Sequence, residues 1–352
     1  MSTARPHLWI RSESRPNERR APVTPDGVGA LLAAGHRVTV EESPHRIAPD
    51  SAYAAAGAQM APEGSWPGAP PDAAILGLKE LPDDPTPLTH SHVMFGHAYK
   101  GQPDGARLLA RFRAGGGTLL DLEYLTDARG RRRCAFGYWA GYAGAAVGLL
   151  AWAAQRRGGL CPSLTDFPSA HALRDELQAT LPIGTRPTAM VIGAKGRVGT
   201  GATDLLRHMG TEPLAWDIGE TRGRTAFPEV LERDLFVNAI LARPGAPVFV
   251  PASAGEAPRR LSVIADVACD PRSEYSPVRV YDRETTWDAP AIRVHGDPPL
   301  DVTAIDNLPS LLPRESTEDF AAQLLPVLLE WDEDPQGTWD RARRLFGKHS
   351  LQ

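Results

Sequence analysis

The sequence predicts an α/β protein whose parallel sheets are wound between helices. Short apolar runs alternate with helical stretches along the first part of the chain, which is the pattern of strands buried in a parallel sheet. A strand, a glycine-rich turn, a helix and a second strand follow one another in the middle of the chain, as in a nucleotide-binding unit. The length of 352 residues is enough for two domains of ordinary size, each with its own core.

The N-terminal segment predicts a strand, a helix and a second strand in turn. Residues 7–11 combine apolar and polar side chains in a short run that is typical of a strand. Thr24 and Pro25 then begin a helix, because threonine caps a helix start and proline fits the first helical position. Gly35 ends this helix, and residues 36–41 alternate as the next strand.

Three continuous apolar runs predict further strands that are buried on both faces of the sheet. They are residues 73–78, 93–95 and 118–121. Residues 136–154 are rich in glycine, alanine and aromatic side chains, and this composition predicts a closely packed helix that connects two domains. A further helix is predicted over residues 170–181.

Lysine is scarce in this chain, and two of its lysines follow two of the predicted strands. Only four of the 38 basic residues are lysines. Lys79 and Glu80 come directly after one apolar run, and His97 and Lys100 come after the next. Because ligands of open α/β sheets bind outside the carboxyl ends of strands, we expect both groups to face one cleft. A lysine amine, unlike an arginine, can give and take a proton, so these residues indicate acid/base chemistry on an anionic substrate.

The most informative local motif predicts a dinucleotide-binding site. Residues 187–192 form a strand that enters a turn with three regularly spaced glycines, and residues 202–209 continue as a helix. Glycines let the backbone approach a pyrophosphate, the helix N-terminus favours its charge, and an acid after the next strand accepts hydrogen bonds from a ribose. The residues assigned to the cofactor are Gly193, Gly196, Arg197, Val198, Gly199 and Asp217.

The choice between NAD and NADP depends on the charges beside the ribose. The carboxylate of Asp217 repels a 2′-phosphate and therefore favours NAD. Arg222 and Arg224 follow closely and are suited to bind that phosphate, so the sequence leaves NADP open. The predicted cofactor is NAD.

The composition argues against several classes of partner. A net charge of −5 predicts no binding of nucleic acid, and the longest apolar stretch, residues 140–154, is too short to span a bilayer. No signal peptide is evident, so we expect a cytoplasmic protein. Three cysteines at unrelated spacings predict neither disulfides nor a metal site. Little lysine beside much alanine, glycine, proline and arginine indicates a GC-rich bacterial genome.

Several blocks of the sequence resemble one known family, and together they run nearly from end to end. The blocks are residues 18–25, 77–80, 95–100, 121–123, 130–132, 135–138, the glycine turn and residues 305–315. On these blocks the chain is identified as a member of the NAD-dependent, lysine-forming saccharopine dehydrogenases. That family is distantly related to alanine dehydrogenase and to the N-terminal region of transhydrogenase.

The resemblance implies two Rossmann-like domains with parallel wound sheets and an active site in the cleft between them. We expect the first part of the substrate-binding domain over residues 1–140 and the NAD-binding domain over residues 141–310. Residues 311–352 are expected to form a C-terminal helical segment that returns to the first domain.

The resemblance also implies the reaction. Members of the family oxidise the secondary amine of an N-substituted amino acid with NAD and hydrolyse the resulting imine, so that saccharopine gives L-lysine, 2-oxoglutarate and NADH. Since a secondary amine is protonated at neutral pH, a base must remove that proton before oxidation. By resemblance Lys79 is this base, and His97 serves the addition of water and the collapse of the carbinolamine. The sequence itself does not separate the two roles.

Residues that bind the substrate are assigned by the same resemblance. They are Arg20, Glu80, Lys100, Glu123, Arg131 and Asp306. The three basic residues match positions that face the substrate carboxylates. A neighbouring positive charge or burial lowers the pKa of the lysine, while a carboxylate such as Glu80 or Glu123 raises it and moderates that effect. The aspartate matches a position near the cofactor and the lysine end of the substrate.

Two other functions stay open from the sequence. The first is the same chemistry on a related adduct of bacterial specialised metabolism, such as a lysine–glutamate conjugate joined through an N–N bond. The second is a non-catalytic NAD-binding regulator, against which the joint presence of Lys79, His97 and Asp306 argues. The expected partner is a small amino-acid substrate, and the expected state is a monomer or a small homo-oligomer.

Overall fold

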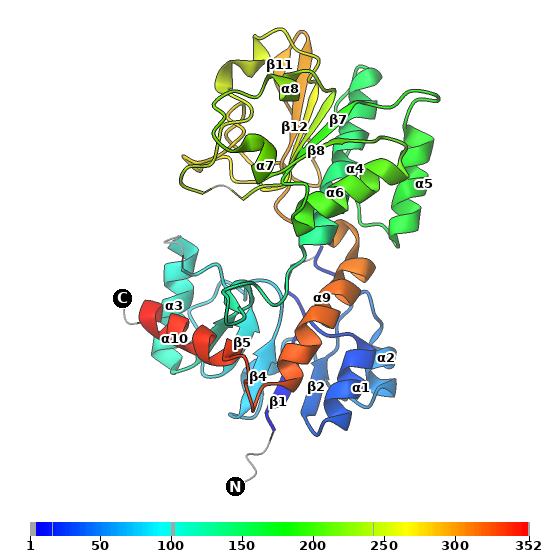
Figure 1. The fold of residues 1–352 in the computed structure, drawn as a ribbon. Helices are drawn as coiled ribbons and strands as arrows, with labels where there is room; N and C mark the ends of the chain where they lie inside the picture. Colours follow the sequence, from blue (N-terminus) through cyan, green and yellow to red (C-terminus); the bar gives the residue numbers. More distant parts are fainter. Residues whose placement is uncertain (1–4, 16, 100–102, 242, 351–352) are drawn as a thin grey trace. The chain divides into compact units, whose positions relative to one another are not determined.

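The computed structural model describes residues 5–15, 17–99, 103–241 and 243–350, and the chain divides into two compact units (Figure 1). The first unit is Met1–Ala135 with Pro313–Gln352, and the second is Phe136–Leu312. These boundaries differ slightly from the expected 140/141 and 310/311. The reason is that each helix stays whole, one beginning at Gly137 in the second unit and one at Pro313 in the first.

The first unit is built on a six-stranded parallel sheet, and the sequence predicted five of its strands but not the short one at Gln59–Ala61. Its strands are β1 (His7–Ile10), β2 (Arg37–Glu41), β3 (Gln59–Ala61), β4 (Ala73–Leu76), β5 (Ser91–Met94) and β6 (Thr118–Asp121). They lie in the order β3-β2-β1-β4-β5-β6, so the direction of winding reverses between β1 and β4. The carboxyl ends meet at one edge, and ligands of such sheets bind at the reversal point of that edge.

Helices from both ends of the chain complete the first unit. In its described residues they are α1 (Pro25–Ala33), α2 (Asp50–Ala55), α3 (Pro103–Gly115), α9 (Pro313–Leu329) and α10 (Thr338–Ser350), with short 3-10 turns at Trp66–Gly68 and Leu122–Tyr124. The predicted start of α1 is confirmed, because the Thr24 hydroxyl accepts the Gly27 N–H at 3.1 Å. The C-terminal helices, orange and red in Figure 1, pack on α1 and on α3 with β6.

The second unit contains a second six-stranded sheet, in the order β11-β12-β10-β9-β7-β8. Its strands are β7 (Ala189–Ile192), β8 (Leu214–Trp216), β9 (Leu235–Asn238), β10 (Val263–Asp266), β11 (Ile292–Gly296) and β12 (Pro299–Thr303). Only β11 runs antiparallel. The helices described here are α4 (Gly137–Arg156), α5 (Ala170–Thr180), α6 (Arg197–His208), α7 (Ile218–Thr221) and α8 (Pro228–Leu231), with 3-10 turns at Ala252–Gly255 and Leu308–Leu311. No helix in the described part of the chain is long and apolar enough to cross a membrane.

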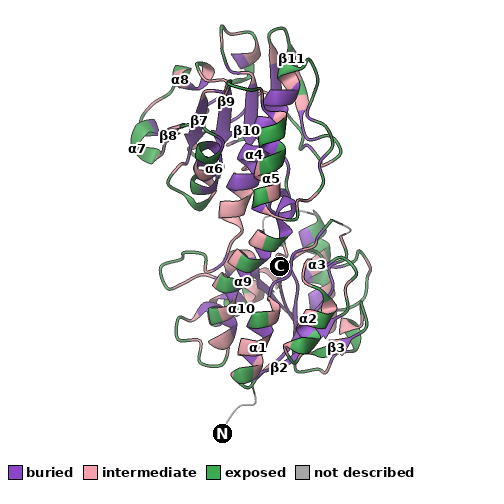
Figure 2. Ribbon diagram, turned by 90° about the vertical axis from the view of Figure 1, so that its right-hand side faces the viewer, coloured by how far each residue is buried: buried purple, intermediate pink, exposed green. Residues whose placement is uncertain are grey.

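Helix α4 is the buried centre of the second unit, and glycines bring it into close contact with α6. Most of the helix is buried, as its purple colour in Figure 2 shows. A Cβ atom at Gly141 would overlap the carbonyl oxygen of Val198, and one at Gly201 would overlap the carbonyl oxygen of Tyr138. Only glycine allows two helix backbones to approach this closely. The contact therefore fixes the start of α6, which follows the glycine turn.

We expect Gly141→Ala to destabilise the protein by about 1–3 kcal/mol, because the added methyl group has no space between the two helices. Gly29→Ala is the matched control, since Gly29 lies in helix α1 with open space where its Cβ would be. That control should gain up to about 1 kcal/mol from helix propensity. Thermal unfolding measures both variants, and an unchanged melting temperature for Gly141→Ala would contradict the packing argument.

Candidate active site

The carboxyl edge of the first sheet gathers several of the predicted catalytic and substrate-binding residues. Leu76 of β4 pairs with Val93 of β5, and Met94 pairs with Asp121 of β6. Lys79, half-buried, follows β4 directly. His97 follows β5, and Glu123 follows β6. Because the three strands are adjacent and parallel, the segments that carry these side chains leave the same edge of the sheet.

His97 has an unusual backbone conformation and a carboxylate beside its ring. Its φ of 48° lies in the left-handed region, which costs a non-glycine residue about 1–3 kcal/mol and occurs most often at functional sites. Its Nδ1 atom is 3.8 Å from Oε2 of Glu123, and its side chain is 54% exposed while that of Glu123 is 21% exposed. The ring lies nearly parallel to that of Phe95, with 6.3 Å between ring centroids. The histidine is thus accessible to solvent and can exchange protons with a substrate.

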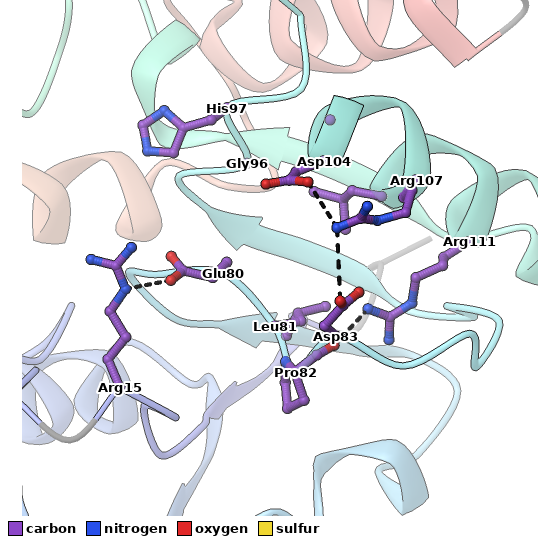
Figure 3. Close-up of a pocket in the computed structure, with 12 residues that line it drawn as sticks. Arg15, Glu80, Leu81, Pro82, Asp83, Gly96, His97, Asp104, Arg107 and Arg111 are labelled. Atoms are coloured by element: carbon purple, nitrogen blue, oxygen red, sulfur yellow. Dashed lines mark hydrogen bonds and ion pairs between the residues drawn. The ribbon is translucent and has the colours of Figure 1, made fainter. Parts of the chain in front are cut away.

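A cavity of about 390 Å³ opens beside this histidine and is lined by charges of both signs (Figure 3). His97 and Glu80 both line it, and Glu80 forms an ion pair with Arg15. On the other side of the cavity, Arg107 lies 2.8 Å from Asp104 and also contacts Asp83. Mixed charges suit a solute that itself carries both signs, as amino acids do.

The arginines predicted to bind substrate carboxylates are already paired within the protein. Arg20 is buried and donates to both oxygens of Glu18, at 2.7 and 2.6 Å. Burial alone would raise the pKa of Glu18, but the charges of Arg20 and Lys79 outweigh burial and lower it. Arg131 is exposed on a turn and pairs with Asp127 at 2.8 Å. Lys100 lies outside the described residues. The contacts of all three basic residues with substrate stay predictions.

The glycine turn of the second unit has the geometry of a pyrophosphate site. Gly193 has a φ of 90°, and a Cβ atom there would lie 2.8 Å from the carbonyl oxygen of Ala239. A Cβ atom at Gly199 would overlap the carbonyl oxygen of Gly193. Gly196 caps α6 without a side-chain hydrogen bond, and the N-terminus of such a helix attracts an anion. The predicted helix start at residue 202 was too late, because α6 begins at Arg197 directly behind the turn.

Asp217 stands where a ribose acceptor is expected, at the end of β8. Its carboxylate accepts the Lys195 N–H at 2.9 Å and the Ile218 N–H at 2.8 Å. A carboxylate has about four acceptor sites, so sites remain for two ribose hydroxyls. Arg224, which the sequence left open as a ligand of a 2′-phosphate, stacks on Trp216 and donates to both oxygens of Glu229. The residues present therefore fit a dinucleotide and favour the form without the 2′-phosphate.

Asp306 belongs to the second unit. It is exposed and follows β12, whose carboxyl end lies at the same edge of the sheet as the glycine turn. Its predicted place near the cofactor and the substrate stays a prediction. In the residues that the structure describes, no group of three histidine, cysteine or acidic side chains is arranged to hold a metal ion.

Four buried charged residues and two exposed apolar side chains were not among the site residues predicted from the sequence. The buried charges are Arg11, Glu13, Glu18 and Asp121, and the exposed apolar side chains are Ile218 and Leu241. The available signal was position, because Arg11 and Glu13 come just after β1 and Asp121 is the last residue of β6. Burial raises the pKa of Asp121 to about 6, and the charge of Glu123 adds to that effect.

Comparison with known proteins places the chain among a well-defined set of relatives. Residues 9–143 match the family described as "Alanine dehydrogenase/PNT, N-terminal domain". The chain is 42% identical to the saccharopine dehydrogenase (NAD(+), L-lysine-forming) of Schizosaccharomyces pombe, over 97% of each chain. Its identity to the protein of the same name from Yarrowia lipolytica is 43%, over 99% of each chain.

Solved structures share the fold at much lower sequence identity. An L-alanine dehydrogenase superposes with a TM-score of 0.67 at 20% identity and covers 97% of this chain and 94% of its own. A transhydrogenase from Sinorhizobium meliloti gives a TM-score of 0.62 at 16% identity, over 91% of each chain. These two likenesses support the architecture of two wound parallel sheets.

We expect Asp217→Asn to lower the preference for NADH over NADPH by at least about tenfold, because the amide keeps an oxygen that caps α7 but removes the charge that repels a 2′-phosphate. Tryptophan fluorescence titration with NADH and with NADPH measures both dissociation constants. Glu212→Gln removes an exposed carboxylate from the amino-terminal side of β8 and serves as the control. An unchanged ratio for Asp217→Asn would show that this carboxylate does not select the cofactor.

Proposed function

Since this chain belongs to the family of NAD-dependent, lysine-forming saccharopine dehydrogenases, we propose that it oxidises saccharopine with NAD and water to L-lysine, 2-oxoglutarate and NADH. The relatives named above support this reaction through more than 40% identity over nearly the whole chain. The observation that carries the chemistry is the pair of titratable side chains, Lys79 and His97, on adjacent loops at the ligand-binding edge of the first sheet.

Lys79 has the first task, which is removal of a proton. The amine of saccharopine is protonated at neutral pH, and its lone pair must be free before the adjacent carbon can be oxidised. Lys79 stands half-buried among charged groups, with Glu18 close enough for the lysine charge to lower the pKa of that carboxyl. Free lysine, with a pKa of about 10.4, is nearly always charged, so a lysine that serves as the base needs burial or a neighbouring positive charge to favour its neutral form. NAD, when bound, accepts the hydride from the substrate.

His97 has the second task, which is hydrolysis of the imine. Water must lose a proton as it attacks the imine carbon, and the resulting carbinolamine must gain a proton on nitrogen as lysine leaves. An exposed imidazole beside Glu123 is suited to both transfers, since its ordinary pKa of about 6.5 lies near neutrality. The carboxylate of Glu123, 3.8 Å from Nδ1, is placed to attract the imidazolium that forms during these transfers.

Binding of the substrate and cofactor is assigned to groups of distinct chemistry. We propose that Arg20, Lys100 and Arg131 attract the substrate carboxylates and that Glu80 and Asp306 interact with its amino groups. The cofactor pyrophosphate is assigned to the N-terminus of α6, and its adenosine ribose to Asp217. The cytoplasmic location, the bacterial origin and the monomeric or small homo-oligomeric state stay predictions from the sequence.

We expect Lys79→Met to lower the turnover of saccharopine by about 10²–10⁴-fold, because that is the usual contribution of a positioned proton acceptor. The affinity for NADH should not change, since the cofactor residues belong to the other unit. NADH absorbance and fluorescence titration measure the two quantities. Lys348→Met, on the exposed side of α10, is the control. Full turnover by Lys79→Met would contradict the assigned chemistry.

The substrate itself is tested by NADH formation on saccharopine and on a lysine–glutamate conjugate joined through an N–N bond. We expect the higher kcat/KM on saccharopine. A higher value on the conjugate would assign the chain to the related reaction, with the same roles for Lys79 and His97. Absence of turnover on both substrates, with NADH still bound, would favour a non-catalytic NAD-binding protein.

A further inference from the structure

Two buried charged residues at the switch point of the first sheet have no part in the proposed proton transfers. Arg11 and Glu13 follow β1, next to the strand that leads to Lys79. Their side chains are 1% and 5% exposed, and Nη2 of the arginine lies 3.3 Å from Oε2 of the glutamate. Burying charges is costly unless partners compensate for the lost water, so their contacts indicate what they do.

The contacts of this pair converge on the Lys79 backbone. Oε1 of Glu13 accepts the Leu78 N–H at 2.6 Å, and Oε2 accepts the Lys79 N–H at 3.0 Å. Arg11 donates from Nη2 to the carbonyl oxygen of Lys79. Side chains from one strand end therefore bind both the N–H and the carbonyl group of the lysine on the next.

Gly77 makes room for this arrangement. A Cβ atom at that position would overlap the guanidinium group of Arg11. Glycine thus lets the arginine pass directly over the backbone between β4 and Lys79. Arg11 also donates to the Ser12 carbonyl oxygen at 3.0 Å, so its position is fixed from two sides.

We propose that Glu13 and Arg11 are positioning residues, which hold the Lys79 main chain so that its amine stays directed at the substrate nitrogen. The Glu13 carboxylate binds two backbone N–H groups, and the Arg11 guanidinium binds the Lys79 carbonyl oxygen. Together these hydrogen bonds restrain both the position and the orientation of the Lys79 main chain. Lys79 lies in a bend outside any helix or strand, where backbone hydrogen bonds of regular structure do not fix it. The inference rests on the proposed role of Lys79 as the base.

The test uses Glu13→Gln in the full-length protein. A glutamine keeps the size of the side chain but offers one acceptor oxygen, and its NH₂ group faces the second N–H. We expect kcat for saccharopine to fall about 10- to 100-fold, as for a catalytic group displaced by roughly 1 Å. The KM for NAD and the dissociation constant of NADH should stay within about twofold, because the cofactor residues lie in the other unit. Glu13→Asp, which keeps both acceptor oxygens, should recover part of the loss.

A double variant separates positioning from general destabilisation. If Glu13 acts only through the lysine, Glu13→Gln should have no further effect on the residual turnover of Lys79→Met. An equal loss in both backgrounds would overturn the proposal. Asp301→Asn is the matched control, because Asp301 is a buried, arginine-paired carboxylate of the second unit, and its loss should leave turnover unchanged.

Hydrogen exchange tests the restraint of the Lys79 main chain by Glu13 without any turnover measurement. We expect the peptide that contains Leu78 and Lys79 to exchange faster in Glu13→Gln, with the rest of the first sheet unchanged. Unchanged exchange in this peptide would overturn the inference even if turnover fell. If wild-type protein failed to oxidise saccharopine, the proposed function would fail. Faster exchange in the variant would then still show that Glu13 restrains the Lys79 main chain, but not that this restraint serves the reaction.

Discussion

The shared carboxyl edge of a parallel sheet is the constraint on which both units depend. Each strand ends at that edge, and soon after it the chain leaves the regular hydrogen-bond ladder of the sheet. In the first unit, buried carboxylates at the strand ends accept the backbone N–H groups of these loops. Glu13 accepts two N–H groups at Leu78 and Lys79, and Asp121 accepts the N–H groups of Gly96 and Glu123 at 3.3 and 2.9 Å. The loops of the predicted base and the predicted histidine are thus held in the same way.

In the second unit the loops at this edge are held by a glycine and by a hydrogen-bond network that contains no basic side chain. Gly193 lets the turn approach the strand end at Ala239. Further along the edge, buried Asp266 accepts hydrogen bonds at 2.8 Å from both Asn238 and Tyr281. Burial raises the pKa of Asp266, although these donors oppose the shift. No basic side chain takes part in this network, and the N-terminus of α6 directly behind the turn favours an anionic cofactor.

Much of the fold could be predicted because strands buried on both faces leave uninterrupted apolar runs. The β11–β12 hairpin was missed, since β11 is an edge strand with no fully buried residue. The start of α6 was misplaced, because Gly199 and Gly201 are residues typical of a loop. Here they serve close contact within the turn and with α4. The loops that carry the proposed acid/base residues could be located from strand ends alone. The burial of Arg20 against Glu18 could not be predicted, because it depends on side-chain directions that no spacing in the sequence encodes.

Arginine and lysine divide the work at this edge according to their acidity. A guanidinium keeps its charge at every working pH and donates in several directions, so Arg11 can bind Glu13 and two carbonyl oxygens at once. An ammonium group in its place would have fewer donors and would make the buried pair sensitive to pH. At position 79 the proposed role has the opposite requirement, since a base must be without its proton before it can accept one from the substrate. Only four of the 38 basic residues are lysines. The proposed base would therefore titrate beside an arginine, bound to its carbonyl oxygen, whose own charge stays constant.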